Sequence, residues 1–157
     1  MICIIEDTRQ QNGKHELKHR AFDASGIRIT RCKLPFGDYA LAPERSIDTK
    51  ANIEEIAQNI SSEHARFRRE CVAALNAGCQ LYVLVENTNG IRSVNEVHNW
   101  YNPELKYRPT AIDGDRLEKS MKTMTKRYGV RFVFCSPEEA GTMVVRILCG
   151  GLEDEQT

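Results

Sequence analysis

The sequence lacks closely spaced cysteine pairs. Its six cysteines are scattered, with no CxxC motif among them. Several fall inside apolar runs, where a free thiol behaves as a small buried hydrophobe. They are Cys3, Cys32, Cys71, Cys79, Cys135 and Cys149. A zinc site or a disulfide framework is therefore disfavoured.

Long apolar runs and glycine-rich nucleotide motifs are also missing. No stretch approaches the roughly 20 apolar residues of a membrane helix, and the N-terminus has no basic region followed by an apolar one. We therefore expect a cytoplasmic protein without a membrane partner. Neither GxGxxG nor GxxxxGK followed by serine or threonine occurs, which disfavours a nucleotide- or cofactor-binding α/β enzyme.

Charge of neither sign is in excess. The chain has 22 lysines and arginines against 22 aspartates and glutamates, so no global positive field attracts nucleic acid. Any DNA binding must come from local basic patches. With 157 residues, 41% of them hydrophobic, the chain fits one domain over residues 1–151. The acidic tail at 152–157 is expected to fray.

What the sequence does contain is an acid and a lysine at strand spacing. Residues 46–50 alternate in character, which predicts a short strand with Asp48 and Lys50 on one side. Asp38 follows a Pro-Phe-Gly turn signal. If the Asp38 segment pairs with this strand as a hairpin, two carboxylates and a lysine meet. Such a group predicts a Mg²⁺ site for phosphodiester hydrolysis.

The spacing of these residues resembles the nuclease motif of the XPF family, within the PD-(D/E)XK superfamily. That motif reads Gly-Asp, nine residues, Glu-Arg-Lys, three residues, Asp. Here Gly37-Asp38 is followed after nine residues by Asp48-Thr49-Lys50, and after three more by Glu54. Asp48 replaces the glutamate of the motif and Glu54 replaces its last aspartate, so both positions still offer carboxylate oxygens. Thr49 replaces an arginine, so one positive charge is lost.

The resemblance implies a Mg²⁺-dependent DNA endonuclease, with Mn²⁺ as a substitute ion, acting on branched or flapped DNA. Its implied catalytic residues are Asp38, Asp48 and Lys50. The metal would be held by Asp38, Asp48 and the Thr49 carbonyl, with Asp7, Glu54 and Glu86 in outer positions. DNA contacts are expected from Arg9, Arg66, Arg68 and Arg69.

Plainer interpretations stay open for several of these residues. Asp7 and Arg9 could form a turn salt bridge or a helix cap, and the three arginines at 66–69 could be an ordinary charged face. The family also implies a homodimer, for which the last two helices carry apolar stripes. A catalytically weak or inactive DNA-binding or dimerisation module of the same fold is the alternative function. The intact acid and lysine argue against it.

The order of elements predicts an α/β fold. Apolar strands alternate with helical stripes, which favours a central mixed β-sheet with helices on both faces, and the resemblance makes this a restriction-endonuclease-like sandwich. Strands are expected at 2–5, 27–34, 46–50, 81–85 and 130–135. Helices are expected at 14–24, 53–60, 67–77 and 117–128, with a last one after Pro137.

Overall fold

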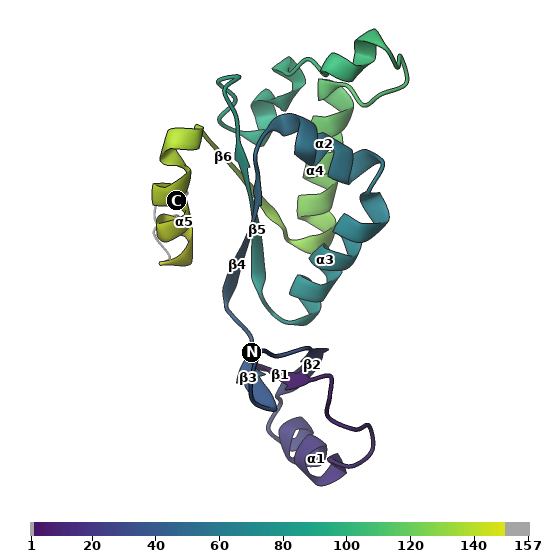
Figure 1. The fold of residues 1–157 in the computed structure, drawn as a ribbon, viewed down its shortest axis with the longest axis vertical. Coiled ribbons are helices and arrows are strands. Elements are labelled where there is room, and N and C mark those ends of the chain that lie inside the picture. The colour runs from purple at the N-terminus through teal and green to yellow at the C-terminus, as the bar shows by residue number, and fades with distance from the viewer. Residues whose placement is uncertain (1, 150–157) are drawn as a thin grey trace.

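A computed structural model describes residues 2–149, and its first part forms a small N-terminal unit (Figure 1). Three strands make its sheet, in the order β2-β1-β3, with β1 parallel to β2 and antiparallel to β3. One helix, α1, connects β1 to β2. The elements are β1 (Cys3–Asp7), α1 (Glu16–Ala24), β2 (Arg28–Cys32) and β3 (Tyr39–Leu41).

The rest of the chain forms a larger main unit around an all-parallel sheet of order β4-β5-β6. Its strands are β4 (Arg45–Lys50), β5 (Gln80–Glu86) and β6 (Arg131–Cys135). Its α-helices are α2 (Ile53–Ser61), α3 (His64–Asn76), α4 (Gly114–Tyr128) and α5 (Ala140–Leu148). Short 3-10 turns cover Val94–Asn99, Pro103–Lys106 and Pro137–Glu139.

The buried strand β5 sets the layers of the main unit. Its side chains alternate between faces, so Val83 and Val85 pack into the core with α2, α3 and α4, while Leu84 packs with Ile147 of α5. Figure 1 shows α2, α3 and α4 on one side of the strands and α5 on the other. The predicted α/β fold with helices on both faces is therefore confirmed for this sheet.

The predicted single central sheet is instead divided in two. Asp38 was expected to bring its segment alongside the Asp48 strand as a hairpin, but β3 pairs with β1 and β4 pairs with β5. The hairpin prediction is therefore wrong. Residues 42–44 connect the two strands, and Pro43 disfavours a helical conformation at Ala42.

The apolar stripes of the last two helices are largely used inside the main unit. Leu117, Met121 and Met124 of α4 are buried in the core, so this helix does not offer the dimer surface that the sequence suggested. On α5, Val145 and Leu148 remain exposed. Among residues 2–149 no helix has both the length and the apolar character that crossing a bilayer requires. The predicted tail at 152–157 and the end of the domain at residue 151 lie outside the described residues.

Candidate functional site

Strand β4 places Asp48 and Lys50 on the helical face of the main sheet. Asp48 stands opposite Val83 and Lys50 opposite Val85, and both valines face α2, α3 and α4. The predicted alternation is therefore found in the structure. The Lys50 amine lies 2.8 Å from Asp48 Oδ2, and Lys50 is only 7% exposed.

This pair opens into a polar hollow of about 310 Å³ between β4 and the helices α2 and α3, called here the Lys50 pocket. The Lys50 amine lies 5.7 Å from the centre of the Phe67 ring, where the face of the ring favours a cation. The pocket is lined by Asp48, Lys50, Glu55, Gln58, Asn59, Glu63, Arg66, Phe67 and Glu70. Its character suits a charged, hydrated ligand.

One oxygen of Asp48 is buried beside the Lys50 amine. Asp48 Oδ2 is buried, and within the described residues no donor meets it in hydrogen-bond geometry, although the Lys50 amine is near enough for an ion pair. The Lys50 ammonium group already supplies a cation to this oxygen. A hard cation at the mouth of the pocket would share the Asp48 carboxylate with Lys50.

Glu70 is a second carboxylate in this pocket that the sequence did not single out. Burial raises the pKa of the Glu70 carboxyl, and the nearby charge of Asp48 raises it further. Helix α3 carries Glu70 one turn after Arg66, and both line the same hollow. Glu70 lies three residues after Phe67, so the sequence could have predicted that both face the inside of the fold. The sequence alone could not have predicted that Glu70 shares a pocket with Asp48.

Replacing Glu70 with glutamine should raise the melting temperature at pH 7 by roughly 1–3 °C. A carboxyl whose folded pKa lies above its unfolded value weakens the fold as pH rises, because the folded state resists ionisation. The gain should disappear below about pH 4, where Glu70 is protonated in both states. Thermal melts of both proteins across this pH range measure it, and a loss of stability at pH 7 would contradict the prediction.

Two of the predicted outer ligands do not face the Lys50 pocket. Glu54 lines a different hollow beside Asn102, Glu104 and Arg108, because consecutive helical residues point in different directions. Its neighbour Glu55 does line the Lys50 pocket, and its carboxylate accepts a hydrogen bond from the Ala51 N–H.

Glu86 lies on the opposite face of the sheet. It follows Val85, which stands opposite Lys50, so strand alternation turns Glu86 toward the side that α5 covers. The sequence predicted Glu86 at the right end of the strand. The sequence could not show which face of the sheet Glu86 occupies, because that depends on the register of β4 on β5.

The predicted residues Asp38, Asp7 and Arg9 belong to the N-terminal unit. The Asp7 carboxylate is fully buried, and Arg9 and the Leu34 N–H occupy it through four hydrogen bonds of 2.6–2.9 Å. The turn salt bridge considered for Asp7 and Arg9 is therefore present. The Asp38 carbonyl accepts a hydrogen bond from the Asp7 N–H at 2.9 Å, which ties it to β1 and not to β4.

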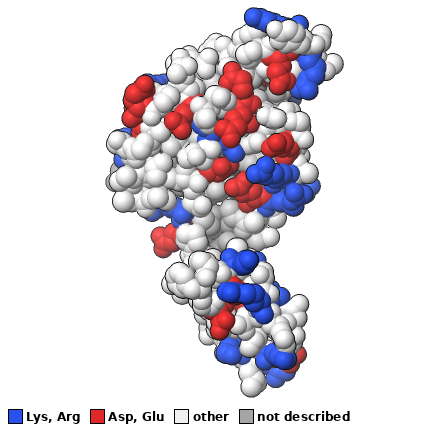
Figure 2. Space-filling view, viewed as in Figure 1, with Lys and Arg blue, Asp and Glu red and all other residues white. Residues whose placement is uncertain are grey.

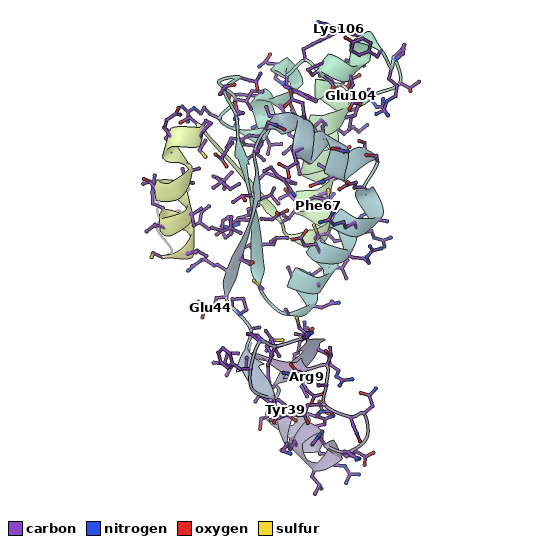
Figure 3. All side chains as sticks on the ribbon, in the orientation of Figure 1. Arg9, Tyr39, Glu44, Phe67, Glu104 and Lys106 are labelled. Atoms are coloured by element: carbon purple, nitrogen blue, oxygen red, sulfur yellow. The ribbon has the colours of Figure 1, made fainter. Side chains whose placement is uncertain are left out.

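Figure 3 shows how far the two halves of the predicted site are separated. Arg9 and Tyr39 are labelled in the N-terminal unit, and Phe67, which lies beside the Lys50 amine, is labelled in the main unit. Glu44 marks the junction between them. The structure thus brings Asp48 and Lys50 together and leaves Asp38 with the other sheet.

The arginines of α3 do not form one cluster. Arg66 lines the Lys50 pocket, whereas Arg68 and Arg69 line a separate hollow of about 650 Å³ with Thr30 of β2. Arg68 follows Arg66 by two positions and therefore points to a different side of α3, and the structure places Arg69 with Arg68. In Figure 2 the basic side chains stand beside acidic ones on the visible face, without one continuous basic band.

The carboxylates of the Lys50 pocket match the donor type of a Mg²⁺ site, but they are few. Asp48 and Glu70 supply hard oxygen atoms, and the Thr49 carbonyl is the third oxygen that the sequence suggested. Within residues 2–149 no three side chains of histidine, cysteine, aspartate or glutamate gather closely enough to hold a metal ion. One chain therefore offers part of a metal site.

Comparisons with known proteins give a likeness in fold. No protein-family model matches the sequence, and no curated protein does. The fold is similar to that of XPF from Aeropyrum pernix. The two share 15% identity with a TM-score of 0.47 over 98% of this chain and 66% of that one. XPF from the same organism in complex with DNA gives 14% identity and a TM-score of 0.47, over 100% of this chain and 68% of that one.

This chain spans about two thirds of the length of those XPF chains. At such low identity the likeness describes the fold alone, and it assigns no activity, substrate or partner to this chain.

Proposed function

We propose that this chain is a Mg²⁺-dependent DNA endonuclease whose chemistry is centred on Asp48 and Lys50. One observation carries the proposal: a buried lysine and the carboxylate that it pairs with, at 2.8 Å, line the same polar pocket. An acid two residues before a lysine on one strand is the pattern that phosphodiester hydrolysis uses in the resembling family. Branched or flapped DNA is the substrate class that follows from that resemblance.

The residues of the pocket have distinct roles in this proposal. Asp48, with Glu70 and the Thr49 carbonyl, would hold Mg²⁺ or its substitute Mn²⁺. A bound Mg²⁺ supplies Lewis-acid polarisation of the phosphate and lowers the pKa of a coordinated water. Lys50 is fixed by Asp48 and by the Phe67 ring, so its ammonium group is positioned to stabilise charge that develops on the phosphate.

The alternative is a DNA-binding or dimerisation module that lacks activity. The separation of Asp38 from Asp48 within one chain favours this alternative, because the pocket then holds an incomplete ligand set. The two functions differ in a simple measurement. A binding module would retain DNA without cutting it in the presence of Mg²⁺.

The deciding experiment incubates the purified chain with flapped, junction and linear DNA. Each substrate is tested with Mg²⁺, with Mn²⁺ and with EDTA, and products are resolved on denaturing gels. We expect cleavage that depends on the metal and is strongest for branched substrates. Tight binding without cleavage under both metals would instead support the binding module.

DNA binding by α3 should depend on the face that an arginine occupies. Replacing Arg66 with glutamine should reduce the slope of log Kd against log salt by about one, because each phosphate contact on duplex DNA contributes about that much. Its ion pair with Glu63 is long, at 3.8 Å, and exposed, so the fold should be unaffected. Arg68→Gln, on the other side of α3, is the matched control and should change the slope less. Equal slopes for Arg66→Gln and the wild type would remove Arg66 from the DNA surface.

A further inference from the structure

The loop at residues 101–111, called here the Tyr107 loop, carries two exposed tyrosines. Tyr107 is 90% exposed and Tyr101 is 59% exposed. Figure 3 labels Glu104 and Lys106 of this loop at the end of the main unit that lies away from the N-terminal unit. A single exposed aromatic side chain is ordinary on a protein surface, so the argument depends on how the loop is held and on what surrounds the ring.

Hydrogen bonds hold the Tyr107 loop in one shape. The buried Asn102 side chain donates to the Ile112 carbonyl at 2.8 Å and so closes the base of the loop. The Asn102 side-chain oxygen also accepts from the Glu104 N–H at 3.0 Å. The Glu104 carbonyl accepts from the N–H groups of Tyr107 and Arg108, at 2.9 and 2.8 Å. The Tyr107 ring therefore projects from a fixed backbone, which reduces the entropy lost when a partner binds to it.

Two cations flank the Tyr107 ring along the chain. Lys106 and Arg108 are both exposed, and Arg108 is oriented by an ion pair of 2.7 Å with Glu104. Glu104 offsets one of the two positive charges, so the loop attracts anions only weakly and the ring provides most of the available contact. An aromatic ring between cations is the combination that single-stranded nucleic acids bind, with bases stacked on the ring and phosphates on the cations.

Gln58 of α2 connects the Tyr107 loop to the Lys50 pocket. Gln58 lines that pocket and also a smaller hollow of about 80 Å³, to which Asn102, Glu104 and Arg108 of the loop contribute. The two hollows are thus neighbours on one helix, whose width with side chains is about 10–12 Å. A strand that leaves the Lys50 pocket over Gln58 comes to Arg108, next to Tyr107.

We infer that the Tyr107 loop binds the unpaired arm of branched DNA, with a base stacked on Tyr107 and the flanking phosphates on Lys106 and Arg108. The inference rests on the proposed function for the position of the duplex at the Lys50 pocket, whereas the stacking itself requires no cleavage. Bases inside a duplex are covered by their neighbours and reach such a ring only after costly unstacking. The loop therefore favours flapped over fully paired DNA.

Binding to single-stranded DNA tests the loop without any cleavage. The full chain is titrated, in EDTA, into a short fluorescein-labelled oligothymidylate, and fluorescence anisotropy gives Kd. Tyr107→Ala should weaken binding by about 5-fold or more, the loss expected for one base stacked on an aromatic ring. Tyr107→Phe keeps the ring and should bind like the wild type. Equal affinity of Tyr107→Ala and the wild type, or no binding by the wild type at low salt, would overturn the inference.

Tyr101→Ala is the matched control, because Tyr101 is an exposed tyrosine of the same loop without a neighbouring cation in the sequence. Both rings lie outside the core, so Tyr101→Ala and Tyr107→Ala should melt at the wild-type temperature. Tyr101→Ala should bind the oligothymidylate almost as tightly as the wild type. An affinity loss as large as that of Tyr107→Ala would contradict the assignment of the contact to Tyr107.

Salt separates stacking from charge in the same titration. Lys106→Gln should reduce the slope of log Kd against log salt by about 0.7, the contribution of one phosphate contact on a single strand. Tyr107→Ala removes no charge, so its affinity loss should persist as salt is raised. A loss that disappears at high salt would show a changed charge arrangement and would overturn the stacking contact.

Flapped and linear duplex DNA distinguish this inference from the proposed function. With Mg²⁺, the wild type should cut flapped DNA in preference to linear duplex, and Tyr107→Ala should reduce that preference by the same factor by which it weakens binding to the oligothymidylate. A wild type that binds the oligothymidylate through Tyr107 but cuts nothing would refute the proposed function and leave the strand contact standing. A Tyr107→Ala protein that binds and cuts flapped DNA like the wild type would refute the inference and leave the function standing.

Discussion

Replacing Lys50 with methionine should reduce DNA cleavage by at least about 10²–10³-fold, the usual cost of removing one group that stabilises transition-state charge. DNA affinity should change little, because such a group contributes mainly to the transition state and not to ground-state binding. Single-turnover cleavage and fluorescence anisotropy on the same flapped substrate measure the two quantities. A Lys50→Met protein that cuts at the wild-type rate would remove Lys50 from the mechanism.

The substitution also disturbs the fold, so it needs a control. Lys50 is buried and pairs with Asp48 at 2.8 Å, and removing one member of such a pair leaves an uncompensated charge. The double variant Lys50→Met/Asp48→Asn removes both charges and should melt at a higher temperature than Lys50→Met alone. If the double variant regains stability but not cleavage, the loss of activity is chemical and not structural.

Replacing Asp7 with alanine should destabilise the N-terminal unit, because the Arg9 and Leu34 backbone N–H groups lose their acceptor. Asp7 is fully buried and accepts four hydrogen bonds, from the Arg9 backbone and guanidinium and from the Leu34 N–H. The melting temperature should fall by several degrees. Denaturant unfolding followed by hydrogen exchange would locate the loss in β1 and its neighbours.

Arg9→Ala is the matched control for Asp7. It removes the guanidinium, which is exposed over 60% of the side chain, but leaves both backbone donors to the Asp7 carboxylate. Its effect should therefore be clearly smaller. An Asp7→Ala protein as stable as the wild type would show that these hydrogen bonds add nothing to the fold.

The same carboxylate makes stability depend on pH. The Arg9 guanidinium and the backbone N–H groups hold the pKa of Asp7 far below its ordinary value. This contribution is fully present above the unfolded pKa of about 4 and is lost as pH falls below it. Asp7→Ala should therefore lose less stability on acidification than the wild type.

Local periodicity determined much of this protein from the sequence alone. The alternation of residues 46–50 fixed Asp48 and Lys50 on one side of a strand, and the structure has them there, in contact. The stripe of Ile53, Ile56 and Ile60 likewise fixed the buried face of α2. Such patterns depend only on the repeat of one element, so neighbouring elements are not needed to read them.

Tertiary structure alone decided which elements meet around that strand. The register of β4 on β5 turned Glu86 away from Lys50, and the packing of α3 brought Glu70 toward Asp48. The partner of β3 was also beyond the sequence pattern, because an open edge can pair with any compatible strand. The spacing of Asp38 and Asp48 along the chain predicted that both belong to one metal site. In the structure β3 pairs with β1 and β4 pairs with β5, so Asp38 and Asp48 lie with different sheets.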